Sequence, residues 1–318
     1  MLKFFLFRPV VLPMIAAMLS VVLTGSRCGV PTDEEVMQPS VEIIASQAPQ
    51  SGFILVELEK DAIFKGDLVL VSNAAPCRFT ESQDLVSVAE GMSGSYFIRS
   101  LDLMLTPDAL TAVNNMMDEF LTQGGSKTVN LVAAWRSEET QQRLYDNSAA
   151  RNGVDHARRF VALPGCSEHH TGLAIDFSLY FPDGTSADFT AEGEYARITE
   201  ACRDHGLIVR YTEEKESLTG IAAEPWHFRY VGVPHAQKMA ELNFCLEEYL
   251  DYLRTFPFDG DHLFIDCAAG QYEIWYEKGS AIHLPVEGEY TVSGDNMSGM
   301  IVTRKLLDGD FSVRYTKG

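Results

Sequence analysis

The sequence predicts an α+β fold, in which a small antiparallel sheet is flanked by helices and a small all-β segment follows. Three patterns indicate this fold. An amphipathic helix begins at Thr106 and Pro107, a β-branched apolar run over residues 128–135 is typical of a buried strand, and apolar and polar residues alternate from residue 263 onward. The chain has 318 residues, enough for one large domain with a smaller attached segment.

The first part of the folded region contains short strands and one strong helix. Residues 53–72 alternate between apolar and polar side chains around a Gly-Asp pair, which predicts short strands. Thr106 is a suitable N-cap for the helix that follows, and Pro107 suits its first position. The helix ends at a Gly-Gly pair, and its apolar stripe consists of Leu110, Val113, Met117, Phe120 and Leu121.

Helices and strands continue up to the β segment. Ser137 precedes a second helix, and a third helix over residues 192–205 ends at Gly206. A strand follows it at residues 207–211, and a final helix covers residues 234–254. A boundary with proline and glycine at residues 257–260 then separates this body from the alternating segment.

The N-terminal 30 residues have the order of a signal peptide or a membrane anchor. Lys3 and Arg8 precede an apolar stretch over residues 10–24, and cleavage and anchoring both stay open. Residues 31–50 are acidic and contain proline, which predicts a linker. We expect residues 51–255 to form the main domain and residues 256–318 an accessory β segment, both exported.

The charge of the chain excludes one class of partner. Lys and Arg number 25 and Asp and Glu 45, so the net charge is 25 − 45 = −20, and no run of five basic residues occurs. Such a surface repels phosphate backbones, so nucleic acid is not the expected partner.

The six cysteines include no CxxC pair, which predicts mostly buried free thiols and at most one bridge.

Two short segments carry the residue types of a catalytic metal site. His169 and Asp176 lie seven residues apart, too far for one helical turn, but a turn through Gly172 would bring both to one point. His227 would complete a set of three zinc ligands, with the fourth position left for water. Glu224, three residues before it, would take a proton from that water. Spacing alone leaves the adjacent His170 open as an alternative to His169.

These segments resemble the zinc D-alanyl-D-alanine carboxypeptidases of the VanY type, within a group that includes VanX-like dipeptidases and some phage endolysins. The family pattern S-x-H-x-x-G-x-A-x-D and the pattern E-x-W-H are matched without departure by Ser167, His169, Gly172, Ala174, Asp176, Glu224, Trp226 and His227. The register of the first pattern makes His169, rather than His170, the ligand. A third block, Trp135-Arg136-Ser137 followed by Gln141, resembles the family's G-Y-R-S-x-x-x-Q segment, with Trp135 in place of Tyr and Ala134 in place of Gly.

The resemblance covers roughly residues 51–255 and implies a substrate and a mechanism. Zn²⁺ on His169, Asp176 and His227 would activate water, and Glu224 would deprotonate it and pass the proton to the leaving D-alanine. The implied substrate is a peptidoglycan stem peptide ending in D-Ala-D-Ala, met at the outer face of the bacterial membrane or in the wall.

Three further residues have expected roles around this site. The planar guanidinium of Arg136 suits an oxyanion or a terminal carboxylate, although an ion pair with Glu138 or Glu139 is the structural alternative. Ser167 and Gln141 are expected to position the substrate by hydrogen bonds.

Several other functions compete with D,D-carboxypeptidase activity. A related zinc D,D-dipeptidase or a peptidoglycan endopeptidase would use the same metal site on another substrate. A non-catalytic wall-binding zinc protein is disfavoured, because a structural zinc has no need of a base such as Glu224. A serine-type enzyme is excluded, because no S-x-x-K sequence occurs in the chain.

Overall fold

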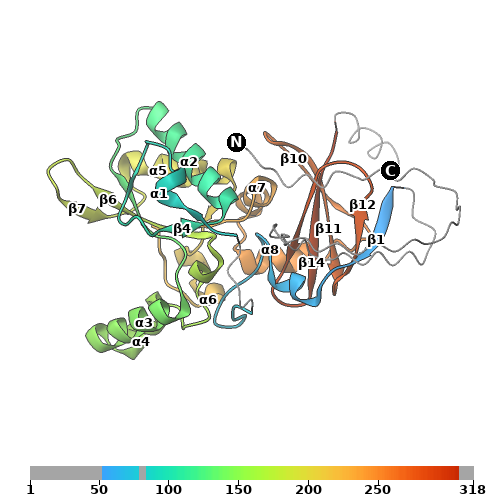
Figure 1. Ribbon diagram of the computed structural model, residues 1–318, viewed down its shortest axis with the longest axis horizontal. Coiled ribbons are helices and arrows are strands. Elements are labelled where there is room, and N and C mark those ends of the chain that lie inside the picture. The colour runs from blue at the N-terminus through green and yellow to red at the C-terminus, as the bar shows by residue number, and fades with distance from the viewer. Residues whose placement is uncertain (1–51, 79–83, 308–318) are drawn as a thin grey trace, which may run out of the picture.

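The computed structural model describes residues 52–78 and 84–307. The predicted export signal at residues 1–30 and the linker at residues 31–50 lie outside the described residues. Figure 1 shows a helix-rich part that carries the larger sheet, beside a part built mainly of strands. Within the described ranges, no helix is both long enough and apolar enough to cross a membrane.

The larger sheet has six strands and is mostly antiparallel, as the sequence predicted. The strands lie in the order β3 (Phe97–Ile98), β5 (Val129–Ala133), β6 (Ala174–Tyr180), β9 (His227–Tyr230) and β8 (Leu207–Val209), and β7 (Ser186–Asp188) pairs with β6. Only β3 and β5 run parallel among these pairs.

Helices cover one face of this sheet and leave the other face for the site. The helices α2 (Pro107–Thr122) and α5 (Ala196–Ala201) share a core with alternate residues of β6, namely Ile175, Phe177 and Leu179. Because successive strand side chains point to opposite faces, Asp176, Ser178 and Tyr180 lie on the face away from that core. The alternation along β6 therefore separates the packed face from the functional face.

The predicted N-capping residues of two helices are confirmed. The Thr106 hydroxyl accepts a hydrogen bond from the amide of Ala109 at 3.4 Å, and Pro107 begins α2. The Ser137 hydroxyl caps α3 (Glu138–Asn152) by accepting from the amide of Thr140 at 3.2 Å. Shorter elements complete this part: β2 (Val86–Ser87), α1 (Val88–Gly91), β4 (Met104–Leu105), α4 (Val154–Phe160), the 3-10 helix η2 (Glu168–Thr171), η3 (Gly193–Tyr195), η4 (Cys202–His205), η5 (Glu213–Lys215) and α6 (Glu216–Thr219).

Two predicted helices are broken in the structure. The helix expected over residues 192–205 consists of η3, α5 and η4, although Gly206 ends it with a φ of 79° as expected. The helix expected over residues 234–254 is two helices, α7 (Val233–Leu242) and α8 (Leu246–Leu253). Asn243 adopts a left-handed φ of 52° between them, a conformation that asparagine tolerates better than most residues.

The C-terminal segment is all β, as predicted. Four antiparallel strands lie in the order β10 (Leu263–Cys267), β11 (Gly270–Lys278), β14 (Gly299–Lys305) and β13 (Tyr290–Gly294). The fifth strand, β12 (Ala281–Pro285), pairs with β1 (Phe53–Glu57) from the other end of the described chain. The first described residues therefore pack with the C-terminal segment, as the blue and red ribbons in Figure 1 show.

Only one of the strands expected within residues 53–72 forms. A 3-10 helix, η1 (Lys60–Phe64), follows β1, and the buried residues Leu68, Val69, Leu70 and Val71 belong to no strand. The guanidinium of Arg229 donates to the carbonyl oxygens of Asp67 at 2.8 Å and Val69 at 2.9 Å. A distant side chain thus occupies backbone groups that a neighbouring strand would otherwise bind.

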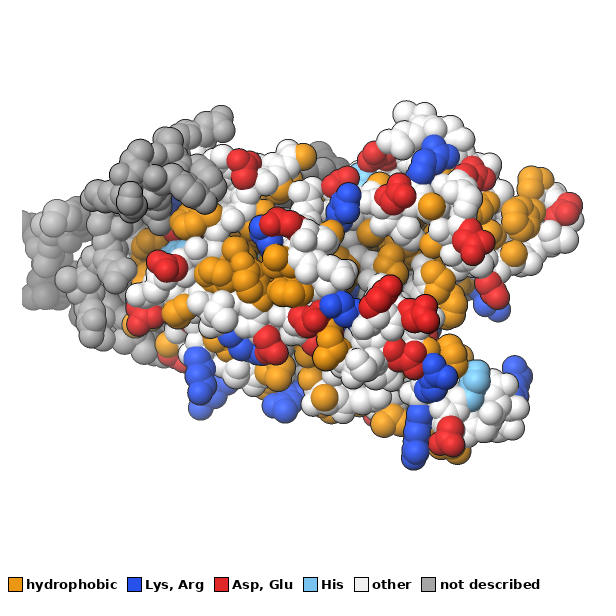
Figure 2. All heavy atoms as spheres, turned by 180° about the vertical axis from the view of Figure 1, so that it is seen from behind, with side chains coloured by type: hydrophobic (Ala, Val, Ile, Leu, Met, Phe, Trp, Pro, Cys, Tyr) orange, Lys and Arg blue, Asp and Glu red, His pale blue; other side chains and the backbone are white. Residues whose placement is uncertain are grey.

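Three of the five described cysteines are buried free thiols, as the sequence predicted, and Cys77 and Cys267 are half-buried. Cys166, Cys202 and Cys245 are buried free thiols, whereas Cys28 lies outside the described residues. On the face shown in Figure 2, Lys and Arg side chains are interspersed with acidic and apolar ones and form no continuous basic stripe.

Candidate active site

The turn predicted at Gly172 is present, and its backbone is left-handed. His169 lies in η2, and Gly172 follows with a φ of 74° and leads directly into β6, which carries Asp176. A Cβ at residue 172 would lie 2.4 Å from Cδ2 of Leu85, and the carbonyl of Gly172 accepts from the amide of Thr106 at 3.0 Å. Glycine therefore meets both a conformational and a steric requirement at this turn.

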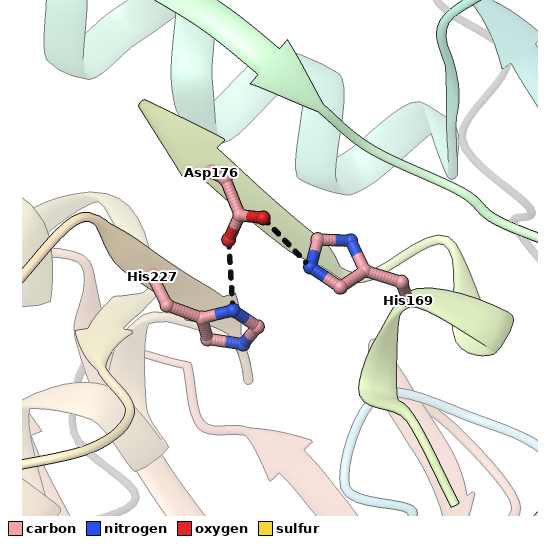
Figure 3. Close-up of side chains that lie close together, drawn as sticks. All are labelled: His169, Asp176 and His227. Atoms are coloured by element: carbon pink, nitrogen blue, oxygen red, sulfur yellow. Dashed lines mark hydrogen bonds and ion pairs between the residues drawn. The ribbon is translucent and has the colours of Figure 1, made fainter. Parts of the chain in front are cut away.

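The three candidate ligands come together on the open face of the sheet. Asp176 on β6 is the register partner of His227 on β9. The Oδ2 atom of Asp176 lies 3.1 Å from Nε2 of His169, and its Oδ1 atom lies 2.9 Å from Nδ1 of His227, as Figure 3 shows. One ligand atom from each residue falls within 4.8 Å of the others.

The two neighbouring histidines have different surroundings. His169 places Nδ1 at 2.7 Å from the carbonyl oxygen of Ala134, which leaves Nε2 directed at Asp176. His170 has both ring nitrogens engaged by the backbone: Nδ1 lies 2.7 Å from the carbonyl oxygen of Arg136, and Nε2 accepts from the amide of Gly165 at 3.2 Å. The structure thus places His169 inside the cluster and His170 outside it.

The donor set of this cluster fits a zinc ion. Two imidazole nitrogens and one carboxylate oxygen are the ligands of catalytic zinc sites, which leave a further position open. Burial lowers the pKa of His169 and so favours the neutral ring that a metal requires. Burial raises the pKa of Asp176, but His169 and His227 outweigh this effect and hold that pKa well below its usual range. The carboxyl group of Asp176 is therefore ionised.

Glu224 lies beside the cluster in the loop before β9. Its Oε2 atom is 3.8 Å from Nδ1 of His227, and its side chain is buried. Burial raises the pKa of Glu224 to about 7, while His227 acts in the opposite direction. A carboxylate at this place can exchange a proton with a group bound near His227.

Arg136 faces the cluster beside Asp176. Its Nη2 atom lies 3.7 Å from Oδ2 of Asp176, whereas the structure pairs it with neither Glu138 nor Glu139. Its Nη1 atom donates to Oε1 of Gln141 at 2.8 Å. The guanidinium therefore faces the candidate site instead of pairing at the start of α3.

Gln141 and Ser167 lie in the framework next to these groups. Gln141 is buried, and its Nε2 atom donates to the carbonyl oxygen of Ala162 at 2.7 Å while its oxygen accepts from Arg136. Ser167 is also buried, and its hydroxyl accepts from the amide of His169 at 3.4 Å. Both side chains hold neighbours in place, and their direct contact with a substrate stays a prediction.

A cleft of about 800 Å³ extends from Asp176 across the open face of the sheet. Asn130 and Ser178 line it, together with Phe97 and Tyr180, whose aromatic rings meet edge to face. Sequence reasoning missed this cleft, although the polar members of the alternating pattern on β6 were a usable signal. Its size and position allow a ligand longer than the metal site alone would hold.

Comparisons with known proteins place these features in a family. A family model described as VanY, D-alanyl-D-alanine carboxypeptidase, matches residues 102–233. A D-alanyl-D-alanine carboxypeptidase of Enterococcus faecium is 31% identical over 253 residues, which cover 77% of each protein. The bifunctional D-Ala-D-Ala dipeptidase and D-Ala-D-Ala carboxypeptidase VanXYC of Enterococcus gallinarum is 43% identical over 141 residues, 41% of this chain and 70% of that protein.

One solved structure is similar over most of the chain. The vancomycin resistance D,D-dipeptidase VanXYg, in complex with a D-Ala-D-Ala phosphinate analogue, matches with a TM-score of 0.72 and 34% sequence identity. The match covers 80% of this chain and 99% of that one.

Proposed function

The chain belongs to the VanY family of D-alanyl-D-alanine carboxypeptidases, and from that premise we propose that it is a zinc enzyme that removes the terminal D-alanine from peptidoglycan stem peptides. One observation carries the proposal. His169, Asp176 and His227 converge on the open face of the sheet, with Glu224 beside His227 and Arg136 beside Asp176.

Each residue of this arrangement has a chemical role in peptide hydrolysis. Zinc on His169, Asp176 and His227 would supply Lewis-acid polarisation of a carbonyl and a lowered pKa for water. The carboxylate of Glu224 accepts a proton from the attacking water and then donates it to the amine nitrogen of the leaving D-alanine. Arg136 binds the negative charge that develops on the carbonyl oxygen or resides on the terminal carboxylate.

The cleft supports a stem peptide as the substrate. It begins at Asp176 and continues past Ser178 toward the pair of Phe97 and Tyr180, and its volume of about 800 Å³ lies within the range of pockets for drug-sized ligands. The part of the stem peptide that precedes D-Ala-D-Ala would lie there, whereas a free dipeptide would leave most of the cleft empty.

A D,D-dipeptidase activity is the second candidate. It is supported by the likeness to VanXYg over 80% of the chain and by the bifunctional relative VanXYC. Both activities would use the same metal cluster, so they differ in substrate length and not in chemistry.

We also propose that residues 1–30 direct the chain out of the cytoplasm. Support comes from Lys3 and Arg8 before the apolar stretch over residues 10–24. Fractionation of cells that express the full chain, with N-terminal sequencing of the product, distinguishes a cleaved signal from a retained anchor. Recovery of the whole chain in the cytoplasm would contradict the proposal.

Release of D-alanine tests the function directly. The full chain is incubated with a stem pentapeptide ending in D-Ala-D-Ala and, separately, with free D-Ala-D-Ala, each with and without a chelator. The proposal expects release of one D-alanine from the pentapeptide, abolished by the chelator and restored by added zinc. Hydrolysis of the dipeptide alone would favour the second candidate, and release that persists after complete removal of the metal would refute zinc catalysis.

A further inference from the structure

A buried ion cluster lies directly behind the proposed metal site. The side chains of Glu168, Arg210 and Arg229 have no exposed surface. The Oε1 atom of Glu168 accepts from Nε of Arg210 at 2.8 Å and from Nη1 of Arg229 at 3.0 Å. The two terminal nitrogens of Arg210 donate to the carboxylate of Glu247 on α8 at 2.9 and 2.6 Å. Two carboxylates thus balance two guanidinium groups.

The second oxygen of Glu168 has an unusual position. Its Oε2 atom is buried and has no hydrogen-bond partner, and the same holds for Nε2 of His227. These two atoms lie 3.6 Å apart. Because a buried polar atom without a partner costs free energy, each atom is the natural partner of the other.

The two arginines fix which atom of Glu168 faces the histidine. Both guanidinium groups donate to Oε1, so rotation of the carboxylate about its last bond would break those contacts. Oε2 is therefore held toward His227 as an acceptor and calls for a proton on Nε2. The opposite ring nitrogen, Nδ1, lies 2.9 Å from Oδ1 of Asp176 in the candidate metal cluster, where it would offer its lone pair to a bound metal.

We propose that Glu168 is a positioning residue that holds the ring of His227 with its proton on Nε2 and its Nδ1 atom turned to the metal. The proposal rests on the zinc site proposed above. A hydrogen bond from the far nitrogen of a ligating histidine orients the ring and selects the tautomer that binds metal. Arg210 and Arg229 hold Glu168, so α8 and the segment at residues 67–69 take part in shaping the site.

The substitution Glu168→Gln separates this role from simple loss of packing. The amide has one acceptor, its oxygen, and the two arginines retain it because they only donate. The amide nitrogen then faces Nε2 of His227 as a donor, which favours the proton on Nδ1, the nitrogen that should bind metal. The variant keeps the shape of the side chain but selects the other tautomer.

Zinc affinity, measured by competition with a chelating dye, is the readout, and circular dichroism checks that the fold is retained. We expect Glu168→Gln to bind zinc about 10–100-fold more weakly than the parent chain. Glu119→Gln is the matched control, because Oε2 of Glu119 also meets a histidine, Nε2 of His205, at 2.7 Å but at a partly exposed position away from the cluster. This control should leave the zinc affinity unchanged.

The outcomes distinguish the positioning role from the zinc site itself. A folded Glu168→Gln variant with zinc affinity within twofold of the parent chain would overturn the positioning role alone. If the parent chain binds no zinc, both proposals fail. Nitrogen NMR of the zinc-loaded parent chain gives a test that needs no variant: we expect the ring proton of His227 on Nε2, and metal on that nitrogen instead would refute the inference.

Discussion

The adjacent histidines His169 and His170 allow a substitution pair that separates a metal ligand from a framework residue. His169 directs Nε2 at Asp176 at 3.1 Å, whereas both ring nitrogens of His170 are engaged by the carbonyl oxygen of Arg136 and the amide of Gly165. We therefore expect His169→Ala to lose zinc and His170→Ala to keep it. The two variants remove the same side chain one position apart.

The size of each effect follows from the contacts. Four-ligand structural zinc sites bind with about 10–16 kcal/mol, or about 2.5–4 kcal/mol per ligand, so loss of His169 should weaken zinc binding roughly 10²–10³-fold. Loss of His170 leaves a carbonyl oxygen and an amide without their partner, at a cost of about 1–3 kcal/mol in the free energy of unfolding. His169→Ala should therefore change the affinity for zinc, whereas His170→Ala should change the free energy of unfolding.

Two measurements separate these effects. Competition with a chelating dye gives the zinc affinity, and urea unfolding of the metal-free chains gives the stability. D-alanine release should follow the zinc affinity at limiting zinc and should be preserved in His170→Ala at temperatures where that variant is folded. Loss of zinc from His170→Ala together with retention in His169→Ala would refute the assignment of the cluster.

Three further predictions follow from other parts of the structure. Glu224→Gln should retain stoichiometric zinc and lose about 10²–10⁴-fold in the rate of D-alanine release, and an unchanged rate would remove Glu224 from the base role. His235 lies between the hydroxyl groups of Tyr249 and Thr303, and burial lowers its pKa from 6.5 to about 3, so its neutral ring supports the fold fully above pH 6.5 and that support is lost as the pH falls. Urea unfolding should show about 2 kcal/mol less stability at pH 5 than at pH 7 from this group, and His235→Gln should lack that part of the pH dependence. Asn296→Ala removes hydrogen bonds to the carbonyl oxygens of Leu70 and Pro76 and should lower the free energy of unfolding by about 2 kcal/mol, with the zinc content of the folded chain unchanged as the control.

Sequence reasoning succeeded where the structure depends on neighbours in the chain. The start of α2 follows from a hydroxyl and a proline at adjacent positions, Thr106 and Pro107. The turn at Gly172 follows from a need for a positive φ that glycine meets without strain. Both signals are complete within a few residues, so no tertiary contact is needed to interpret them.

The failures concern segments whose partners are distant. The break at Asn243 leaves the apolar pattern of α7 and α8 nearly continuous, so periodicity alone predicted one helix. The alternation at residues 67–71 predicted a strand, but the backbone there is bound by the guanidinium of Arg229, which lies 160 or more residues later in the chain. A pairing over that distance has no local signature.

The candidate site shows the same division between local and distant information. The convergence of His169, Asp176 and His227 was predictable because residue types suited to zinc occur here in short patterns. Glu168, Arg210 and Arg229 were not, because a lone charged residue in a sequence is usually solvated and nothing local shows that these three meet in the interior.

The buried ion cluster links the candidate metal site to parts of the fold that lie outside its sequence motifs. Arg210 joins Glu168 to α8, and Arg229 joins it to the segment at residues 67–69, so the orientation of His227 depends on contacts outside the metal-binding patterns. A buried charge that loses its partner costs free energy. Loss of any one of these residues should therefore destabilise the fold more than loss of a surface charge would. In the proposed zinc site, the residue types of the three candidate ligands would select the metal, whereas the surrounding fold would set the orientation of their side chains.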